Sequence, residues 1–578
     1  MVTHVFGCIR KLNRVLDASI RTFNSTKCTM TLWQTKIVKG SNGEKFFLSP
    51  DISYPETLVH EFVWNNIENY PNHVALECGI SGKKYTFAQA KDATNYIGRS
   101  LRNIGLKEKD VIALVAPNFP DTVLGFLGGL SGGYVVTPVN PYYTVDEMSK
   151  QLLRTNAKVV ITSASIASTT LAATRASLPS ETPFIVINDK TGSIPEGSIP
   201  FNDLITRGKS LPPVSTNRTF DDIATLPFSS GTTGLPKGVM LTHRNLVSNI
   251  MMFQCCLDES HIPTTSTSQE VVPAILPFYH IYGLNTVVLS NLAFGGKVIS
   301  IPKFASETFL NVLEKSKATS LYCVPPIILF LSTSPLVKIQ HLEHLRTISS
   351  GAAPIAKTDI DKLINKFNID PSKIRFRQGY GLTESSSVAF VESGQKFSSI
   401  GKNVNGCLAR LVNIETQQDI VTPNENGELW IKGPHIMKGY FNDEASTKEI
   451  LTEDKWLKTG DIAYFDEECD FFITGRMKEL IKVKGFQVPP AELEALLRTH
   501  PDVNDAAVIG IPHAKYGEVP KAFIVPNKDK KLTEDDIKNF MKEKVSDYKQ
   551  LKGGIIFINE IPKNAAGKIL RLKLKNDY

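Results

Sequence analysis

The sequence predicts an α/β protein of at least two folding units, a large N-terminal α/β unit and a small C-terminal α+β unit. At 578 residues the chain is too long for one compact core. Between about residues 54 and 476, short apolar runs alternate with segments of helical pattern. Such alternation of buried strands and helices is typical of an α/β architecture.

The elements of the large unit can be placed in order. A helix is predicted over residues 86–104, and strand-length apolar runs follow at 111–116, 158–162 and 183–187. No stretch of the sequence approaches the roughly 18 uninterrupted apolar residues of a membrane span. A transmembrane segment is therefore not expected, whereas peripheral membrane contact stays open.

The small unit follows with shorter elements. A helix that begins at a proline is predicted over 490–498 and a second helix over 533–544. Strand-like runs lie at 506–510, 522–525 and 554–558. This mixture predicts a compact α+β unit after about residue 476.

Composition narrows the class of protein. With 42% hydrophobic and 21% charged residues, the chain reads as a soluble globular protein. The net charge of +7 is small for this length and the lysines are spread along the chain, so no nucleic-acid partner is expected. Eight cysteines without C-x-x-C spacing argue against structural zinc and disulfides, which fits a reducing compartment.

The first 29 residues differ from the rest, because they contain five basic residues and a single acid, Asp17. At about 100° per residue, apolar side chains fall on one helical face and basic side chains on the other. This pattern predicts a mitochondrial targeting segment over residues 1–29, with an amphipathic helix docked on the protein or on a membrane as the alternative. The apolar face is Val2, Val5, Phe6, Ile9, Leu12, Leu16, Ile20 and Phe23, and the basic face is Arg10, Lys11, Arg14 and Arg21.

A mitochondrial location is therefore expected, with a cytoplasmic one as the alternative. The chain ends in Lys-Asn-Asp-Tyr and not in a peroxisomal S-K-L signal, which disfavours a peroxisomal location.

The run S-S-G-T-T-G-L-P-K-G-V from Ser229 to Val239 has the composition of a loop that holds phosphate groups. Glycines let backbone N–H groups approach an anion, hydroxyl groups donate hydrogen bonds, and Lys237 adds positive charge. It is not a Walker A loop, because Gly238 follows Lys237 where that motif requires Ser or Thr. Taken alone, the run is also compatible with a surface loop. The candidate phosphate-binding residues are Ser229, Ser230, Gly231, Thr232, Thr233, Gly234 and Lys237.

Four further motifs follow in order along the chain. They are G-Y-G-L-T-E at 379–384, T-G-D at 459–461, G-R-M-K-E-L-I-K-V-K-G-F-Q at 475–487 and P-K-N-A-A-G-K-I-L at 562–570. Together with the first run they resemble the adenylate-forming superfamily of acyl-CoA synthetases, 4-coumarate-CoA ligases and beetle luciferases. The resemblance implies an N-terminal adenylation domain, here 30–475, joined by a hinge to a swivelling C-terminal domain, here 476–578.

The resemblance also implies the nucleotide site. A carboxylate can accept from both ribose hydroxyls, which suits Asp461, and Arg476 can donate to the same sugar. Tyr380 offers a ring against adenine. Thr383 is assigned to the phosphate and Glu384 to Mg²⁺, although both residues also suit a helix cap. Small or polar neighbours complete the expected slot for the base: Ala352, Ala353, Gln378 and Gly379.

Lys568 is the expected catalytic lysine. A charged ammonium on a flexible stem can reach both an incoming carboxylate and the α-phosphate of ATP. Ala565, Ala566 and Gly567 make its loop slim enough to enter a cleft. A lysine in a lysine-rich tail would otherwise be solvated, so this role depends on the resemblance.

The acyl pocket is expected around L-P-F-Y-H-I-Y-G, where relatives have a gating histidine at the position of His280. An isolated histidine among aromatic residues is otherwise a core residue. An apolar wall here would favour an acid that is apolar beyond its carboxylate. The expected lining is Tyr279, His280, Tyr282, Ser386 and Val388.

Coenzyme A is expected at the loop after the hinge. Lys478 lies where the family has its hinge residue, and Lys482, Lys484, Gly485 and Gln487 follow it. The three lysines occupy even-numbered positions and would project to one face of a strand. Such a face suits CoA phosphates, although a solvated strand edge has the same pattern.

The predicted function is an ATP-dependent acid–CoA ligase that forms an acyl adenylate of a fatty or aryl acid and then its CoA thioester, with Mg²⁺ as cofactor. Ser385, Ser386 and Ser387 replace the Ala-Gly-Pro pattern of plant coumarate ligases, which favours a fatty acid over a phenylpropanoid acid. The alternatives are a luciferase-like monooxygenase and a silent nucleotide-binding homologue.

Overall fold

The computed structural model describes residues 35–578, apart from 41–42, 230–235, 258–260, 354, 356, 393–395, 485, 529, 543, 565–566 and the side chain of Gln487. The segment 1–29, for which a targeting role is expected, lies outside these residues. Among the helices described, none is long and apolar enough to cross a membrane.

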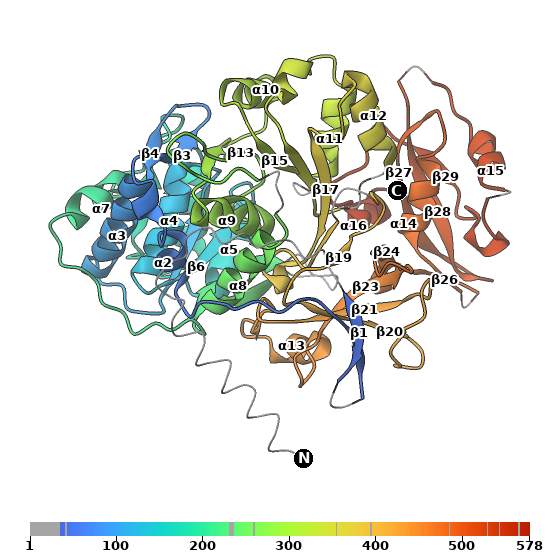
Figure 1. Cartoon of the computed structure of the whole chain (residues 1–578), viewed down its shortest axis with the longest axis horizontal. Helices are drawn as coiled ribbons and strands as arrows, with labels where there is room; N and C mark the ends of the chain where they lie inside the picture. The colour runs from blue at the N-terminus through green and yellow to red at the C-terminus, as the bar shows by residue number, and fades with distance from the viewer. Residues whose placement is uncertain are drawn as a thin grey trace. The chain divides into compact units, whose positions relative to one another are not determined.

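The first sheet has nine strands and a largely parallel centre, in the order β11-β12-β10-β6-β5-β7-β8-β9 with β22 paired to β12. Its strand β6 is labelled in Figure 1. Its central strands are buried along their whole length, which is why they appear in the sequence as continuous apolar runs. The strand predictions at 111–116, 158–162 and 183–187 are confirmed. The strands are β5 Val111–Val115, β6 Val135–Val139, β7 Val159–Ser163, β8 Phe184–Ile187, β9 Ile199–Pro200, β10 Ile223–Thr225, β11 Phe228–Ser229, β12 Lys237–Thr242 and β22 Gly439–Tyr440.

Helices connect the strands of this sheet. The helix predicted over 86–104 is α3, Phe87–Asn103, and it begins at a capping box in which Thr86 and Gln89 satisfy each other's backbone N–H groups. The other helices here are α4 Pro120–Ser131, η2 Ala164–Ile166, α5 Val145–Thr155, α6 Ala167–Ser177, α7 Phe201–Gly208 and α8 His243–Gln254.

Two further sheets complete the α/β region. One has the order β13-β14-β3-β4, and the other has the order β15-β16-β17-β18-β19. Their strands are β3 Val74–Cys78, β4 Lys84–Thr86, β13 Val271–Ala274, β14 Lys297–Ser300, β15 Ser320–Cys323, β16 Thr347–Ser350, β17 Arg375–Tyr380, β18 Phe390–Glu392 and β19 Lys402–Asn403. The helices are α2 Val59–Val63, η1 Ile67–Asn69, η3 Tyr282–Leu289, α9 Ser290–Ala293, α10 Ser306–Lys315, α11 Pro325–Thr333, η4 Ile339–Leu342, α12 Lys357–Phe367 and η5 Thr383–Ser385.

An antiparallel sheet ends this part of the chain, in the order β1-β2-β20-β21-β23-β24. Its last strand ends at Arg476, and the next strand along the chain belongs to a different sheet. The elements are β1 Lys36–Lys39, β2 Lys45–Leu48, β20 Leu408–Val412, β21 Gly427–Lys432, α13 Glu444–Ile450, β23 Leu457–Phe465 and β24 Phe471–Arg476.

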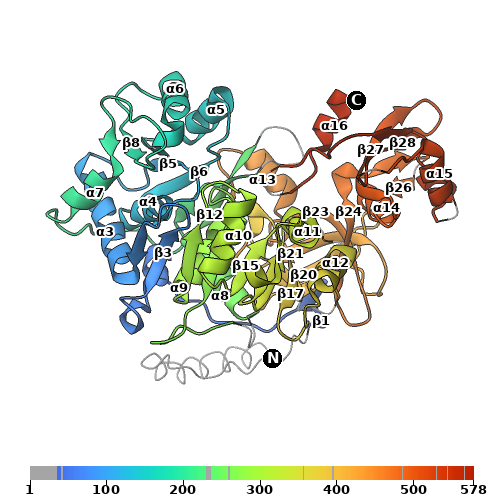
Figure 2. The ribbon, with the colours of Figure 1, turned by 90° about the horizontal axis from the view of Figure 1, so that it is seen from above.

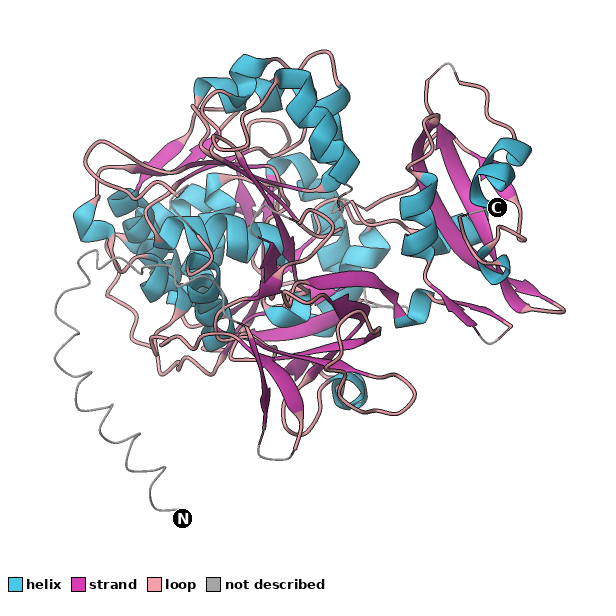
Figure 3. Cartoon of the chain, turned by 45° about the vertical axis from the view of Figure 1, so that its right-hand side comes forward, coloured by secondary structure: helices cyan, strands magenta, loops and turns pink. Residues whose placement is uncertain are grey.

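The C-terminal sheet has the order β26-β25-β28-β27, with β29 paired to β28, and α14 and α15 lie beside it (Figure 2). Figure 3 shows its strands in magenta and its helices in cyan. The predicted α+β pattern of this part is confirmed. The elements are η6 Met477–Glu479, β25 Ile481–Val483, β26 Phe486–Val488, α14 Pro490–Leu497, β27 Val503–His513, β28 Gly517–Pro526, α15 Glu534–Lys542, η7 Asp547–Lys549, β29 Ile555–Phe557 and α16 Arg571–Asp577.

The expectation of three lysines on one strand face is wrong. Lys478 lies in the short 3₁₀ helix η6, and Lys482 lies on the three-residue strand β25. Lys484 follows that strand in a left-handed turn with a φ of 52°. The strand is too short to include all three lysines, because a helical turn precedes it and a tight turn ends it.

Candidate active site

The residues assigned to the ribose and adenine form one contact group. The pairing of β23 with β24 sets Asp461 opposite Arg476, and Arg476 Nε lies 2.7 Å from Asp461 Oδ1. The Tyr380 hydroxyl donates to Asp461 Oδ2 at 2.6 Å. Burial, with the Asp461 charge beside it, raises the pKa of Tyr380 well above its usual range. Asp461 therefore lies between a cation and a neutral phenol.

The expected slot for the base is built from two adjacent strand ends. In the β16–β17 register Ser350 lies opposite Gln378, so the strand ends that lead to Ala352 and to Tyr380 lie side by side. Ala352 has a φ of 67°, and a Cβ added at Gly379 would meet only the Phe390 carbonyl oxygen, at 4.0 Å. Gln378 accepts a hydrogen bond from the backbone N–H of Ile355. The small residues thus leave room beside Tyr380.

The two described ends of the phosphate loop pair with each other, since Ser229 lies opposite Lys237 in the β11–β12 ladder. The Ser229 hydroxyl donates to Glu384 Oε1 at 2.9 Å. Lys237 Nζ donates to Ser446 Oγ at 2.7 Å and lies 5.1 Å from the centre of the Tyr440 ring. Ser230, Gly231, Thr232, Thr233 and Gly234 lie outside the described residues.

Tyr440 is a member of this site that the sequence analysis missed. Its hydroxyl donates to the same Glu384 oxygen, Oε1, at 2.9 Å, and the residue is 7% exposed. The strand β22 brings it there by pairing with β12, Tyr440 lying opposite Val239. The sequence Gly439-Tyr440 does not by itself indicate this contact, because the pairing of β22 with β12 joins residues far apart in the chain.

Glu384 and Ser229 fit a magnesium site. Carboxylate and hydroxyl oxygens are hard ligands, and Mg²⁺ commonly takes one or two carboxylates with substrate phosphates supplying further oxygens. Among the described residues, no group of three or more His, Cys, Asp and Glu side chains could hold a metal alone. Thr383 lies next to Glu384, at the first position of η5.

The Lys568 loop lies close to the start of α11. The backbone N–H of Lys568 donates to Asn564 Oδ1 at 2.9 Å, and the Lys568 carbonyl accepts from the N–H of Asn564 at 2.9 Å. Gly567 has a φ of 78°, and a Cβ there would lie 3.1 Å from Pro326 Cδ at the start of α11. The loop thus approaches α11 closely, as a slim loop can; Ala565 and Ala566 lie outside the described residues.

Burial and the neighbouring charged groups shift the pKa of Lys568. Burial lowers the pKa of Lys568, and the neighbouring Arg476 lowers it further. Glu479 and Asp461 act in the opposite direction, and Arg571 lowers the pKa slightly. Lys568 therefore shares the electrostatic field of the residues assigned to the ribose.

Among the residues expected at the acyl pocket, His280 and Tyr282 lie together. The Tyr282 backbone N–H donates to His280 Nδ1 at 3.3 Å, and Tyr282 begins the π-helix η3. Burial lowers the pKa of His280 to about 4, so its ring is neutral at pH 7. The Tyr282 ring packs against Gly351, where a Cβ would lie 3.0 Å from Cε1, and its hydroxyl donates to the Ser349 carbonyl. The Tyr282 ring, an expected part of the acyl-pocket lining, is thus held in place by its packing against Gly351 and by the hydrogen bond of its hydroxyl.

Tyr279 has other neighbours. Burial, with smaller contributions from Tyr142 and Tyr143, raises the pKa of Tyr279 to about 12. The surroundings of Tyr279 therefore include the segment between β6 and α5.

The three serines after Glu384 are buried and their hydroxyls are already bonded. Ser386 Oγ donates to the His435 carbonyl at 2.8 Å, and Ser387 Oγ shares a 2.7 Å hydrogen bond with Thr286 Oγ1. Ser385 Oγ bonds within its own turn, to the backbone of Leu382. Ser386 therefore cannot offer a free hydroxyl to a substrate without losing this bond.

The backbone of these serines has a fixed conformation. Ser386 has a φ of 59° and Ser387 a φ of 122°, whereas proline is held near −65°. Asn249 Nδ2 donates to the Val388 carbonyl at 2.6 Å, and Asn285 Nδ2 donates to the Ser386 carbonyl at 2.9 Å. This segment could not contain the proline of the coumarate-ligase pattern without changing its path.

The residues expected at the hinge and at CoA lie around the start of the C-terminal sheet. Lys478 Nζ lies 3.5 Å from Glu449 Oε1 of α13. The backbone N–H of Lys482 donates to Glu518, and Lys482 lies opposite Gln487 in the β25–β26 ladder. Gly485 and the Gln487 side chain lie outside the described residues.

A basic and aromatic surface adjoins these residues, and the sequence analysis missed it. Three ammonium groups lie near the Tyr516 ring: Lys484 at 4.5 Å, Lys552 at 5.2 Å and Lys515 at 5.7 Å from its centre. We call these four residues the Tyr516 cluster. Beside it, the rings of Phe486 and Tyr548 stack at 4.5 Å, with Phe486 54% exposed.

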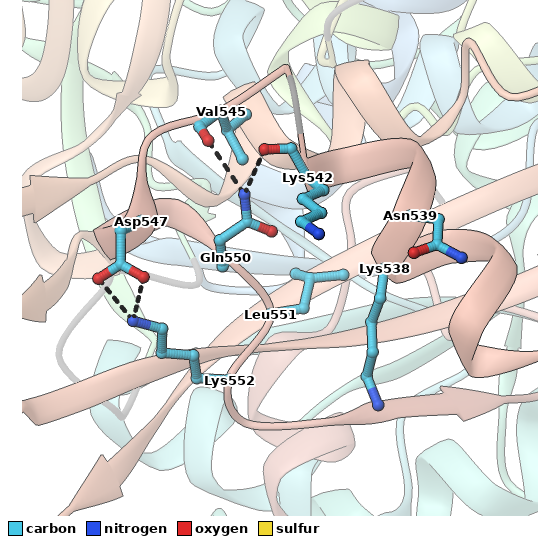
Figure 4. A pocket seen from close by; sticks show the side chains of 8 residues that line it. All are labelled: Lys538, Asn539, Lys542, Val545, Asp547, Gln550, Leu551 and Lys552. Carbon is cyan, nitrogen blue, oxygen red and sulfur yellow. Dashed lines mark hydrogen bonds and ion pairs between the residues drawn. The ribbon is translucent and has the colours of Figure 1, made fainter.

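A pocket of about 460 Å³ shares Lys552 with the Tyr516 cluster. Figure 4 shows the side chains that line this pocket. Asp547 connects the two, because Lys552 Nζ lies 2.7 Å from both of its carboxylate oxygens and Lys484 Nζ lies 3.7 Å from Oδ2. The pocket is lined by Lys538, Asn539, Lys542, Val545, Asp547, Gln550, Leu551 and Lys552.

Comparison with known proteins agrees with this arrangement. The AMP-binding enzyme family matches residues 63–441, and the AMP-binding enzyme C-terminal domain matches residues 492–568. Probable 4-coumarate–CoA ligase 1 of Dictyostelium discoideum is 38% identical, with 92% of this chain and 98% of the relative covered. 4-Coumarate–CoA ligase 1 of Solanum tuberosum is 37% identical, with 92% and 97% covered.

Solved structures show the same fold. ATP-bound MatB from Rhodopseudomonas palustris superposes with a TM-score of 0.79 at 25% identity, covering 91% of this chain and 99% of that one. An anthranilate CoA ligase, AuaEII, in complex with anthranoyl-AMP also gives 0.79, at 23% identity, covering 90% and 97%. The chain therefore belongs to the AMP-binding enzyme family and groups within it with the acid–CoA ligases, which confirms the resemblance found in the motifs.

Proposed function

We propose that this acid–CoA ligase uses ATP and Mg²⁺ to convert an apolar carboxylic acid into an acyl adenylate, and then transfers the acyl group to coenzyme A. The observation that carries the proposal is the contact group of Asp461, Arg476 and Tyr380, with the charges of Arg476 and Asp461 acting on the buried Lys568. This arrangement combines a lysine for the reacting centre with residues suited to the sugar and base of ATP.

In the first step the carboxylate oxygen of the acid attacks the α-phosphate of ATP. An oxygen–phosphorus bond forms, the bond to the β-phosphate bridge breaks, and pyrophosphate leaves. The barrier is electrostatic, because two anions must approach each other. Lys568 supplies the cation at the reacting atoms, while Asp461 and Arg476 orient the ribose.

Glu384 and Ser229 would hold Mg²⁺, which neutralises phosphate charge when it is bound. Lys237 would contact the terminal phosphates, and its bond to Ser446 would then exchange for one to ATP. Tyr440 and Ser229 fix the Glu384 carboxylate for this role.

In the second step the CoA thiolate attacks the acyl carbonyl, and AMP leaves as the thioester forms. Lys482, Lys484, Gly485 and Gln487 are proposed to face CoA in this step. The Tyr516 cluster adds cations suited to CoA phosphates, and the exposed Phe486 ring adds a surface on which a base can stack.

The acid is proposed to be apolar beyond its carboxylate. The neutral His280 and the fixed ring of Tyr282 support an apolar wall, and the bonded serines offer no free hydroxyl. Fatty and aryl acids both satisfy this description. The relatives described above are 4-coumarate–CoA ligases by name, which favours an aryl acid, whereas the positive φ of Ser387 separates this pocket from the proline-containing pattern.

A mitochondrial location is proposed from the first 29 residues alone, with the segment serving as an address and not as part of the enzyme. The division of the remaining chain into domains at residues 475 and 476 is likewise proposed. It lies one residue before the end of β24 at Arg476, the last residue of that sheet along the chain.

Acid-dependent release of pyrophosphate, followed by CoA thioester formation with a panel of acids, tests this function. Release that requires both acid and ATP, with the thioester appearing only when CoA is added, is the expected result. Acid-dependent consumption of oxygen with light emission would support the monooxygenase alternative. ATP binding without turnover on any acid would support a silent homologue.

A further inference from the structure

Helix α8 carries two buried asparagines, Asn245 and Asn249, whose side-chain amides bind backbone groups of two different segments. The two residues lie four positions apart, so their side chains leave the helix one turn apart on the same face. Asn245 is 7% exposed and Asn249 is 1% exposed. The helix follows β12 directly, and β12 begins with Lys237 of the phosphate loop. The two amides therefore connect the phosphate-loop strand with the segments that they bind.

Asn249 binds residues 385–388, which we call the acyl segment because the expected lining of the acyl pocket includes two of them. Asn249 Nδ2 donates to the Val388 carbonyl at 2.6 Å, and the Val388 N–H donates to Asn249 Oδ1 at 3.3 Å. The amide thus pairs with both backbone groups of one residue, as a neighbouring strand would. Asn285 of η3 adds a second link, because its Nδ2 donates to the Ser386 carbonyl at 2.9 Å and to Asn249 Oδ1 at 3.3 Å.

The acyl segment has a backbone that needs such support. Ser386 has a φ of 59° and Ser387 a φ of 122°, in the region that favours glycine. Residues with a side chain adopt such angles at a cost in free energy, and they keep them only where the surrounding structure holds them. The segment also packs closely on Gly381, where an added Cβ would collide with the Ser387 carbonyl. Loss of the bonds from Asn249 to Val388 should therefore let the acyl segment relax.

Asn245 binds residues 434–440, which we call the Glu384 support. Its Nδ2 donates to the carbonyls of Pro434 and Ile436, each at 2.8 Å. The residue after Ile436 donates its backbone N–H to the Glu384 carbonyl at 2.8 Å. At the end of the support, the Tyr440 hydroxyl donates to Glu384 Oε1 at 2.9 Å. Asn245 therefore holds the segment that holds both the backbone and the carboxylate of Glu384.

The acyl segment and the Glu384 support also contact each other. Ser386 Oγ donates to the His435 carbonyl at 2.8 Å, and His435 lies between the two residues whose carbonyls Asn245 binds. Helix α8 thus supports both sides of one junction. Such support matters for a reaction between two bound substrates, because a misplacement of about 1 Å can cost about a hundredfold in rate.

We propose that Asn245 and Asn249 are positioning residues that align the acid with Mg·ATP: Asn249 fixes the acyl segment, and Asn245 fixes the Glu384 support. The proposal rests on the proposed function, since it assumes that the acyl segment serves the acid and that Glu384 serves Mg²⁺.

The two positions should differ in the substrate that they affect. Without Asn249, the Val388 carbonyl loses its donor, while Glu384 keeps its bonds from Ser229 and Tyr440. Without Asn245, the Glu384 support loses two bonds, while Val388 stays bound to Asn249. A merely structural role would lower stability in both variants without this difference between the substrates.

Asn249→Ala and Asn245→Ala test the proposal in the pyrophosphate-release assay, with the panel acid for which wild type has the highest kcat/KM. Asn249→Ala should raise KM for the acid about fivefold or more, because a buried carbonyl is left unpaired, and keep KM for Mg·ATP within about twofold of wild type. Asn245→Ala should raise KM for Mg·ATP about fivefold or more and change KM for the acid less.

Gln151→Ala is the matched control. Gln151 of α5 is also buried, and its Nε2 donates at 3.1 Å to the Pro138 carbonyl and at 3.1 Å to Thr137 Oγ1, both on β6. The variant loses the same kind of amide bond away from the acyl segment and the Glu384 support. It should lower the melting temperature and leave both KM values within about twofold of wild type.

A second readout does not depend on turnover. Mg·ATP added without acid should raise the melting temperature of wild type, because a ligand that binds the folded state stabilises it. This rise should be retained in Asn249→Ala and reduced in Asn245→Ala. If either alanine variant does not fold, Asn249→Asp and Asn245→Asp give the same comparison, since aspartate keeps the shape and the acceptor oxygen and replaces the donor nitrogen.

Parallel changes of the two KM values in both variants, or no change in either value, would overturn the proposal. An equal Mg·ATP-induced rise in the two variants would do the same. Failure of the proposed function would look different, because wild type itself would release no acid-dependent pyrophosphate.

Discussion

Tyr440→Phe removes one hydroxyl from the site and almost nothing else. The ring stays beneath Lys237, whose Nζ lies 5.1 Å from its centre, and the pairing of β22 with β12 needs only the backbone. The lost contact is the 2.9 Å hydrogen bond to Glu384 Oε1, which leaves Ser229 as the remaining donor found to that oxygen among the described residues. The change therefore isolates the orientation of the Glu384 carboxylate.

A hydrogen bond to a charged acceptor contributes about 1.5–3 kcal/mol. If this energy is used to hold Glu384 in the adenylation step, kcat/KM for ATP should fall about ten- to a hundredfold. Pyrophosphate release at saturating acid, with ATP and Mg²⁺ varied together, measures the ratio. The effect should shrink as Mg²⁺ is raised, because excess metal compensates for a poorly held ligand.

Tyr85→Phe is the matched control, since the Tyr85 hydroxyl donates to Asp121 Oδ1 at 3.0 Å, away from the site. It removes the same kind of bond and should leave kcat/KM unchanged. A Tyr440→Phe enzyme within twofold of wild type, at equal melting temperature, would refute the reasoning about Glu384.

Three further predictions concern the loop after the hinge, the acid and the N-terminal segment. Lys482→Ala or Gln487→Ala should slow thioester formation and let adenylate accumulate, as single-turnover assays of the two half-reactions would reveal; an equal loss in both would make the loop structural. For straight-chain acids of six to eighteen carbons, kcat/KM should rise with length until the pocket is full, with up to about 0.8 kcal/mol per buried methylene, and exceed that for 4-coumarate. A flat profile with 4-coumarate preferred would instead favour a phenylpropanoid acid. Deletion of residues 1–29 should leave activity intact, and a reporter fused to those residues should reach mitochondria; a diffuse signal would count against the targeting role.

The sequence alone was sufficient to predict those elements that depend on residues close together in the chain. Continuous apolar runs predict β5, β7 and β8 because these strands are buried on both faces, and the helical pattern over 86–104 predicts α3. The contact of Asp461 with Arg476 could be expected from the resemblance, since both residues lie within family motifs.

Contacts between distant residues could not be found in this way. Tyr440 meets Glu384 across 56 positions, and Arg571 meets Glu479 across 92. Neither pair has a spacing that marks it, because strand pairing creates the first contact and packing within the C-terminal part of the chain creates the second. The prediction that three lysines share one strand face is wrong for a local reason, because Lys484 adopts a left-handed turn directly after the end of β25.

The central claim is that Lys568 serves the adenylation step and not the transfer to CoA. Lys568→Ala should therefore be assayed in both half-reactions, as acid-dependent pyrophosphate release and as thioester formation from a preformed acyl adenylate. The account predicts a loss of about a hundredfold or more in the first rate, with the second close to wild type. Pyrophosphate release at near wild-type speed, or an equal loss in both rates, would contradict it.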